Sequence, residues 1–265
     1  TPRSSSAASD VYKRQAVGSA AAAIPGANVV RKIVPLDREN RLDVAAICAA
    51  IDSDTRVVVI CNPNNPTGTK ITLSEIEQII SKTPSEALVF VDEAYIEFTD
   101  DPASETAIEF AKSRSNVLVS RTFSKIHGLA GLRVGYGIAD ARVISRLKDY
   151  MLGGLAFNMP GILAAQQAID DQDHIRATLK LNRTIHETWT KFFHDVGWQM
   201  TPSVTCFAWV NLGTDCSPLV EFLADRNVLV GGGQRWDLPN YIRISIGTEE
   251  ENEMLLSGVK AFLAS

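Results

Sequence analysis

A lysine with hydroxyl groups and glycines around it follows directly on an apolar run of the chain. The segment from Ser120 reads SRTFSK and ends at Lys125, and Arg133 comes eight residues later. Most lysines are solvated surface charges. An amine in this setting instead suits imine formation with a carbonyl compound, and the arginine and hydroxyl groups suit an anion bound beside it.

An aspartate follows a second apolar run, LVFV, within the segment VDEAY at residues 91–95. At the end of a buried strand Asp92 would itself be nearly buried, and a buried carboxylate requires a cationic or hydrogen-bonding partner. The simpler interpretation is a helix N-cap. The functional interpretation is a carboxylate that holds a protonated ring nitrogen.

Two further clusters complete the set. The loop NPNNPTG at 62–68 follows the run RVVVIC, and it is either an ordinary turn or a binding loop, because two X-Pro bonds and an Asn pair exceed what a turn needs. In NYIRISIG at 240–247, Arg243 alternates with apolar neighbours. It is therefore either an exposed strand arginine or a bidentate clamp on a carboxylate.

The elements that must position these residues alternate between strand and helix. Apolar runs predict buried strands at 56–61, 88–91, 117–119 and 134–138, and helical spacing predicts helices at 73–80, 104–112 and 140–150. This order predicts an α/β fold with a largely parallel sheet. The clusters fall at the ends of predicted strands, where open α/β sheets bind their ligands.

The pattern changes after residue 160. A long helical stretch at 160–196 precedes short strands at 206–212, 228–230 and 241–246 and helices at 218–226 and 249–263. We expect a partial large domain at 16–160 and a smaller C-terminal α+β domain at 161–265. Residues 1–15 are expected to be a non-native or disordered leader outside the fold, since DVYKRQ at 10–15 resembles a translated sequencing-library adapter.

Composition excludes several classes of function. The chain is 45% hydrophobic and 22% charged with a net charge of −5, which is ordinary for a globular enzyme and argues against a nucleic-acid or anionic-membrane surface. Its apolar stretches are too short to span a bilayer. The four cysteines show no CxxC pair or zinc spacing, so we expect no metal, and reduced thiols in a cytoplasmic protein.

Together the four clusters resemble those of the fold-type-I aminotransferases that use pyridoxal 5'-phosphate (PLP), most closely the histidinol-phosphate aminotransferase branch. NPNNPTG, VDEAY, SRTFSK…GLAGLRVGY and YIRISIGTEEEN occur in the family's order and near its spacing, from about residue 18 to the C-terminus. The resemblance implies an aspartate-aminotransferase-like large domain, incomplete here, that binds PLP, and a small C-terminal domain.

The resemblance also implies roles around the cofactor ring. Lys125 forms the imine with PLP and then acts as acid and base in the proton shift. Asp92 pairs with the protonated pyridine nitrogen. Asn65 and Tyr95 hydrogen-bond the ring's phenolic oxygen, which makes Tyr95 part of the catalytic set and Asn65 a neighbour of the substrate.

For the remaining groups, the resemblance implies that Ser124 and Arg133 hold the cofactor phosphate, with Thr122 as an extra hydroxyl. Arg243 grips the α-carboxylate of the substrate or the equivalent end of an amino alcohol. The implied reaction is transamination between an amino acid or derived amine, with histidinol phosphate as one candidate, and a 2-oxo acid such as 2-oxoglutarate. The implied partners are these small molecules and a second subunit in a homodimer.

Two departures bear on the substrate. The histidinol-phosphate branch commonly has an arginine after the VLV strand, whereas here VLV is followed by three glycines, 231–233, and by Arg235 further on. Either a glycine nest of backbone N–H groups replaces the arginine, or the substrate differs. Cys206 also stands where the family often has an asparagine.

Other interpretations remain open. The family's N-terminal part, which supplies a phosphate-binding loop and a ring stacked on the cofactor, would precede residue 16, so the chain as given is expected to be inactive. A PLP-dependent decarboxylase or other lyase uses the same scaffold. An aminotransferase-like effector domain of a transcription regulator is a further alternative.

Overall fold

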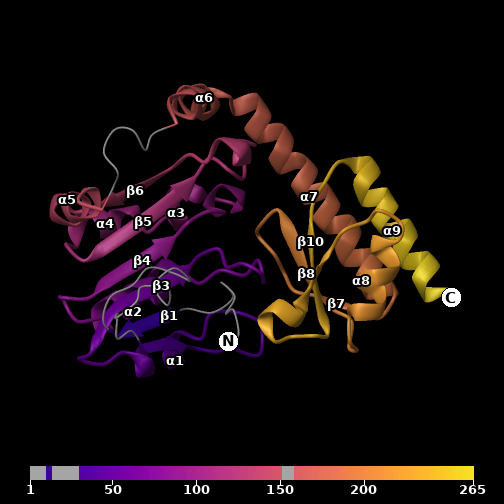
Figure 1. The fold of residues 1–265 in the computed structure, drawn as a ribbon, viewed down its shortest axis with the longest axis horizontal. Helices are drawn as coiled ribbons and strands as arrows, with labels where there is room; N and C mark the ends of the chain where they lie inside the picture. The colour runs from indigo at the N-terminus through magenta and orange to yellow at the C-terminus, as the bar shows by residue number, and fades with distance from the viewer. Residues whose placement is uncertain (1–9, 14–29, 151–157) are drawn as a thin grey trace.

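The computed structural model describes residues 10–13, 30–150 and 158–265, which form two β-sheets with helices around them (Figure 1). The larger sheet has six strands in the order β2-β1-β3-β4-β5-β6. Strands β3, β4 and β5 are parallel, whereas β1 pairs antiparallel with β2 and β3, and β6 pairs antiparallel with β5. Their bounds are Asp10–Lys13 (β1), Val30–Ile33 (β2), Thr55–Cys61 (β3), Leu88–Asp92 (β4), Val117–Thr122 (β5) and Gly135–Ala139 (β6). The predicted α/β class and the four predicted strands are confirmed, but the fourth, β6, is mostly exposed rather than buried.

The first core lies between this sheet and the helices α1 and α2. Its buried side chains include Val and Ile from β3, β4 and β5 and Ile from α1 and α2, which suits strands covered by helices. Helix α1 spans Val44–Ala50, and α2 spans Leu73–Lys82. Helix α2 begins with a capping box, in which Thr72 and Glu75 each accept a hydrogen bond from the other's backbone N–H.

Short helices and turns connect the other strands of the larger sheet. They are η2 (Ile96–Phe98), α3 (Pro102–Glu105), α4 (Ile108–Ser113), η3 (Ala130–Leu132) and α5 (Ala141–Lys148). A single helix at 104–112 was predicted, and this is wrong. The chain breaks between α3 and α4 because Thr106 and Ala107 turn inward to donate hydrogen bonds to the carboxylate of Glu93.

The second sheet is antiparallel, with strand order β7-β8-β10-β9. Helices α7, α8 and α9 pack on it, and Trp189 and Phe193 of α7 are fully buried in its core. In Figure 1, α6 and α7 run from the larger sheet across to this second core. The bounds are α6 Met159–Asp170, α7 Gln172–Asp195, β7 Gln199–Met200, β8 Phe207–Asn211, α8 Ser217–Ala224, β9 Gly231–Gly232, η5 Gly233–Trp236, β10 Tyr241–Ser245 and α9 Glu249–Leu263.

Two predictions for this part differ from the structure. The long helical stretch is two helices, because Asp171 ends α6 and caps α7 by accepting a hydrogen bond from the His174 N–H. The strand predicted at 228–230 is wrong. Val228 and Val230 pack against the second core, whereas the backbone that pairs with β10 belongs to Gly231 and Gly232.

The expected leader also differs from the structure in part. Asp10–Lys13 forms β1 and pairs with both β2 and β3, so these four residues lie within the sheet. Val11 and Tyr12 favour strand structure, and an unpaired sheet edge accepts any such segment. Among the described residues, no helix has the length and apolar character needed to cross a membrane.

Candidate active site

The predicted carboxylate lies in a row of side chains at the carboxyl ends of the parallel strands. Cys61 of β3 is the register partner of Asp92 of β4, which is the register partner of Ser120 of β5. The Ser120 hydroxyl donates to Asp92 Oδ1 at 3.1 Å. Burial raises the pKa of Asp92, while the hydrogen bonds from Ser120 and from the Ala94 N–H and the charge of Lys125 oppose this effect.

Lys125 lies next to this row, in the loop after β5. Its side chain is exposed, and its Nζ is 5.2 Å from the centroid of the Tyr95 ring. Its positive charge acts on Asp92, on Cys61 and on Cys206. The amine therefore lies where the two sheets meet, within electrostatic reach of Asp92, the carboxylate predicted to pair with the ring nitrogen of the cofactor.

Tyr95 and Arg243 come from different sheets and meet at the ring of Phe207. Tyr95 is 4% exposed, and its ring meets the Phe207 ring edge-on at 5.1 Å. The Arg243 guanidinium lies 3.9 Å from the centroid of the same Phe207 ring. This contact is a cation–π interaction that fixes the arginine against an apolar surface.

The guanidinium of Arg243 hydrogen-bonds the neutral side chain of Tyr95, and the charge of Arg235 also acts on it. Nη1 donates to Ser245 Oγ at 3.3 Å, and the buried Nε has no partner. Burial lowers the pKa of Arg243, and the nearby Tyr95 and Cys206 side chains partly oppose this. A half-buried guanidinium with an unused donor is suited to bind a carboxylate or phosphate.

The predicted anion-binding residues also come together, beside a hollow of about 680 Å³ next to β5 and β6 that Thr122, Ser124 and Arg133 help to line. Arg133 Nη1 donates to Ser124 Oγ at 3.4 Å. Thr122 accepts a hydrogen bond from the Ser124 N–H, and its own hydroxyl donates to the Val134 carbonyl. The structure thus gives Thr122 a supporting position within this group.

The loop at 62–68 closes the other side of the row. The Asn65 backbone N–H interacts with the Cys61 thiol, which places Asn65 beside Cys61 and Asp92. Burial, followed by the charge of Asp92, raises the pKa of Cys61 to about 12. Gly68 has a left-handed φ of +74°, and a Cβ added there would overlap the Ser203 hydroxyl, so this loop packs directly against the second part of the chain.

Sequence reasoning missed the groups that support this site. Glu93 is 1% exposed on its side chain and is paired with Arg121 at 3.0 Å, although both residues stand within the quoted motifs. Ser120 could have been found from the sequence, because it stands at the end of the next parallel strand, in register with Asp92. The sequence carried no local signal for Phe207, which contacts Tyr95 and Arg243 only through the tertiary fold.

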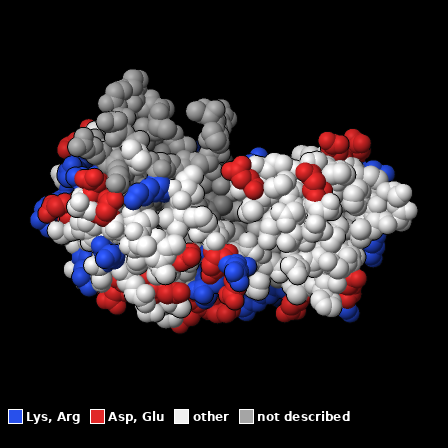
Figure 2. All heavy atoms as spheres, turned by 90° about the horizontal axis from the view of Figure 1, so that it is seen from below, with Lys and Arg blue, Asp and Glu red and all other residues white. Residues whose placement is uncertain are grey.

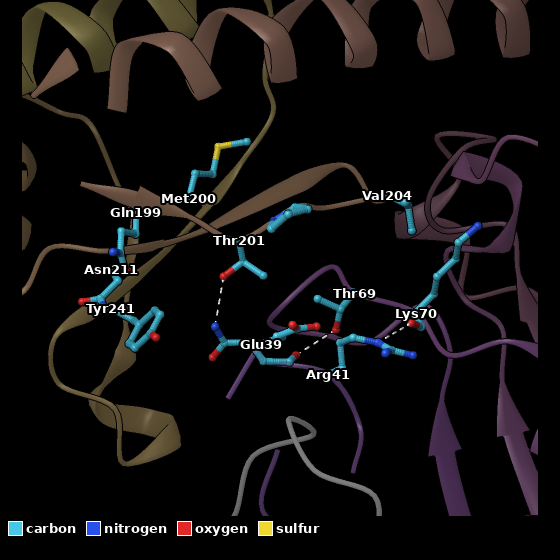
Figure 3. A pocket seen from close by; sticks show the side chains of 12 residues that line it. Glu39, Arg41, Thr69, Lys70, Gln199, Met200, Thr201, Val204, Asn211 and Tyr241 are labelled. Carbon is cyan, nitrogen blue, oxygen red and sulfur yellow. Dashed lines mark hydrogen bonds between the residues drawn. The ribbon is translucent and has the colours of Figure 1, made fainter. Parts of the chain in front are cut away.

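A second hollow, of about 490 Å³, lies between the two sheets and contains none of the predicted site residues (Figure 3). The Asn40 side chain donates to Thr201 across it at 3.3 Å, and Thr69 donates to the Asn40 carbonyl. We interpret it as a seam between the two parts of the molecule.

Figure 2 shows acidic and basic side chains interspersed over one face, without a continuous basic surface there.

Comparison with known proteins gives consistent results. The family model "Aminotransferase class I and II" matches residues 19–259. The histidinol-phosphate aminotransferase of Brevibacillus brevis is 38% identical over 237 residues, which are 89% of this chain and 64% of that protein. That of Maricaulis maris is 36% identical, over 90% of this chain and 66% of its own length. The chain thus spans about two thirds of the length of these curated relatives.

Two solved structures show the same fold. The histidinol-phosphate aminotransferase of Sinorhizobium meliloti, solved in complex with pyridoxal-5'-phosphate, superposes with a TM-score of 0.81 at 26% identity and covers 88% of this chain and 64% of its own. A protein of Erwinia carotovora atroseptica, to which histidinol-phosphate aminotransferase activity has been assigned, superposes with a TM-score of 0.80 at 30% identity. The match covers 88% of this chain and 68% of that protein's chain.

Proposed function

Because this chain belongs to the class I and II aminotransferases, we propose that the full-length protein carries out PLP-dependent transamination. The reaction would transfer the amino group of an amino acid or amino-acid-derived amine to a 2-oxo acid such as 2-oxoglutarate. Histidinol phosphate is the candidate amine, because the relatives at 36% and 38% identity are named for it. The observation that carries the proposal is that the Lys125 amine lies 5.2 Å from the Tyr95 ring and within electrostatic reach of the half-buried Asp92 carboxylate.

The described residues fit PLP. The Asp92 carboxylate is held only by neutral donors and by the charge of Lys125, and a cationic ring nitrogen would stabilise its charged form. Tyr95 and Asn65 would bind the phenolic oxygen of the ring. The hydroxyl of Ser124 and the guanidinium of Arg133, already in contact, would bind the phosphate.

When bound, PLP would withdraw electrons from the substrate carbon that bears the amino group. The chain's own residues would then bind, orient and move protons. The exposed Lys125 would attach the cofactor through Nζ and afterwards take up and release a proton at Nζ. Arg243 would orient an anionic end of the substrate, and the buried rings of Tyr95 and Phe207 would exclude water from that side.

We also propose that the domain division lies near residue 160, that two copies of the full-length protein form a homodimer, and that the protein is cytoplasmic and binds no nucleic acid. The separate cores of the two sheets support the division. The net charge of −5 supports the last point. The amino donor and the 2-oxo acid are the partners expected for the family.

The test is covalent capture at Lys125. The protein is incubated with PLP, reduced with borohydride and digested, and mass spectrometry locates the modified lysine. We expect modification at Lys125, loss of this adduct in Lys125→Ala, and no change in Lys112→Ala, which removes an exposed lysine paired with Glu109. Stoichiometric modification that persists in Lys125→Ala would refute the assignment. Amino transfer from histidinol phosphate to 2-oxoglutarate is then measured with the full-length protein, because the chain as given is expected to be inactive.

A further inference from the structure

The loop that bears Lys125 is a tight turn directly after β5. The Gly128 N–H donates to the Lys125 carbonyl at 3.0 Å. The Leu129 N–H donates to the Phe123 carbonyl at 2.9 Å and closes the turn. Ile126, the residue after the lysine, is fully buried. Because the four-carbon stem of a lysine is flexible, the position of its amine depends on how firmly this backbone is held.

A histidine at the start of α7 holds the turn from outside. Nε2 of His174 lies 3.0 Å from the Ile126 carbonyl oxygen. Since a carbonyl oxygen can only accept a hydrogen bond, Nε2 carries the proton that it receives. The backbone N–H of His174 donates to Asp171, the residue at which α6 ends and α7 begins. The imidazole therefore ties the residue next to Lys125 to the first turn of α7.

A second histidine, His127, reaches from the turn itself towards α6. Burial lowers the pKa of His127, hydrogen bonding at the Ala168 backbone opposes this effect, and the charge of His174 adds to it. Its Nδ1 is buried and has no hydrogen-bond partner among the described residues, which leaves Nε2 as the nitrogen available to Ala168. The two histidines therefore connect the lysine turn to both helices, one on each side of Asp171.

Apolar packing brings the same parts of the chain together. Ile126, Tyr95 and Phe207 belong to one buried cluster, and Ile175 and Leu179 of α7 pack against it. Burial of apolar surface holds α7 against the turn but has no direction of its own. Hydrogen bonds are directional, so the two histidines supply the orientation that the packing leaves open.

We propose that His127 and His174 are positioning residues for Lys125. By holding the turn to α6 and α7, they keep the amine beside the Tyr95 ring, 5.2 Å from its centroid. The inference rests on the proposed function, because the amine requires a fixed position only if it reacts with PLP. A misplacement on the order of 1 Å is enough to slow a reacting group strongly, so the loss of either hydrogen bond should be measurable at Lys125.

The test replaces each histidine in two ways. His174→Ala removes the donor, whereas His174→Gln keeps a side-chain N–H that can reach the Ile126 carbonyl. His127→Leu and His127→Gln form the corresponding pair for the second histidine. His194→Ala is the control, because His194 lies in the last turn of the same helix and its side chain is 88% exposed.

Two measurements are made on each variant. The first is borohydride capture of PLP at Lys125 over a range of PLP concentrations, and reductive methylation of the same lysine by formaldehyde is the reference reaction. Formaldehyde is small and reacts with an accessible amine in any orientation. The second measurement, without PLP, is amide hydrogen exchange of the peptide 123–129, which reports on opening of the turn.

We expect His174→Ala and His127→Leu to raise the PLP concentration for half-maximal capture at Lys125 by about threefold to tenfold, as for one lost hydrogen bond. Exchange in the turn should become faster in both variants. Reductive methylation of Lys125 should not change, and His194→Ala should behave as the unaltered protein does. The two glutamine variants should recover most of the loss.

Three results would overturn the inference. The first is unchanged capture or unchanged exchange in both His174→Ala and His127→Leu. The second is an equal impairment of the glutamine variants, because the hydrogen bond would then not be the cause. The third is an equal fall in methylation, because the amine would then only be less accessible. An effect of one histidine alone removes the other from the proposal.

The proposed function fails on a different observation. If borohydride fixes no PLP at Lys125 in the unaltered protein, the proposed transamination is wrong, and the exchange measurement alone decides whether the histidines hold the turn. If PLP is fixed there and the histidine variants capture it as the unaltered protein does, the function stands and the positioning role is refuted.

Discussion

Removing the positive charge from the Glu93–Arg121 pair should destabilise the fold severely. Both Nε and Nη2 of Arg121 donate to Glu93 Oε2, at 3.1 and 3.0 Å. The Glu93 side chain is 1% exposed and that of Arg121 15%. Arg121→Met keeps the length and apolar part of the side chain but leaves a buried carboxylate without its cation.

The expected magnitude follows from what Glu93 retains. The Ala107 N–H at 2.6 Å and the Thr106 hydroxyl at 2.9 and 3.1 Å remain as donors, but both are neutral. Breaking a buried pair by removing one partner costs about 3–5 kcal/mol, because an uncompensated charge stays buried. Glu93 directly follows Asp92 at the end of β4 and also anchors the start of α4. The loss of stability should therefore affect the whole larger sheet.

Urea unfolding followed by circular dichroism measures the effect. The double variant Glu93→Gln/Arg121→Met should be more stable than Arg121→Met alone, because no charge is then left buried. Arg142→Met is the control, since that arginine is 79% exposed in its pair with Asp140, and it should change the unfolding free energy by at most about 0.5 kcal/mol. A loss below about 1 kcal/mol for Arg121→Met would refute the reasoning.

Two further changes test the site and its supporting loop. In the full-length protein, Asp92→Asn should lower the transamination rate by two or more orders of magnitude, as expected from losing a preorganised charge worth about 3 kcal/mol. In the protein without PLP, the pKa of Asp92 in the folded state lies above its usual 3.8, so ionising Asp92 lowers the stability of the fold. As pH rises from below 4 through that raised pKa, the unaltered protein should therefore lose stability relative to Asp92→Asn. Equal pH slopes of the two proteins in urea titrations would contradict this. Gly68→Ala should lower the free energy of unfolding by at least about 1 kcal/mol more than Gly213→Ala does. The two glycines share a φ near +75°, but only Gly68 faces the Ser203 side chain. Equal unfolding midpoints for the two variants would show that an added Cβ at Gly68 does not clash with Ser203.

The sequence alone predicted the elements that local chemistry defines. Runs such as RVVVIC and LVFV indicated β3 and β4, because a strand buried on both faces must be continuously apolar. Once those strands are parallel, their carboxyl ends share one edge of the sheet. The order of the motifs along the chain is therefore enough to place Asp92, Lys125 and the loop at 62–68 together.

Elements that depend on long-range pairing were not predictable in this way. Val228 and Val230 look more like a strand than Gly231 and Gly232, yet the glycines pair with β10. Strand propensity mostly reflects how a side chain fits its surroundings, and here the two valines pack against the second core while the ladder takes the next two residues. Only the arrangement around β10 decides between them.

The site divides along the same line. The sequence determined which residues carry chemistry, because an amine, a carboxylate and guanidinium groups are properties of single side chains placed at strand ends. The tertiary structure decided which of them are paired and with what. Ser120 contacts Asp92 through the register of β4 and β5, and Arg121 pairs with Glu93. Phe207 contacts both Tyr95 and Arg243, which belongs to the second sheet. These contacts join residues far apart in the chain, and their energies depend on burial and distance, which exist only once both sheets have formed.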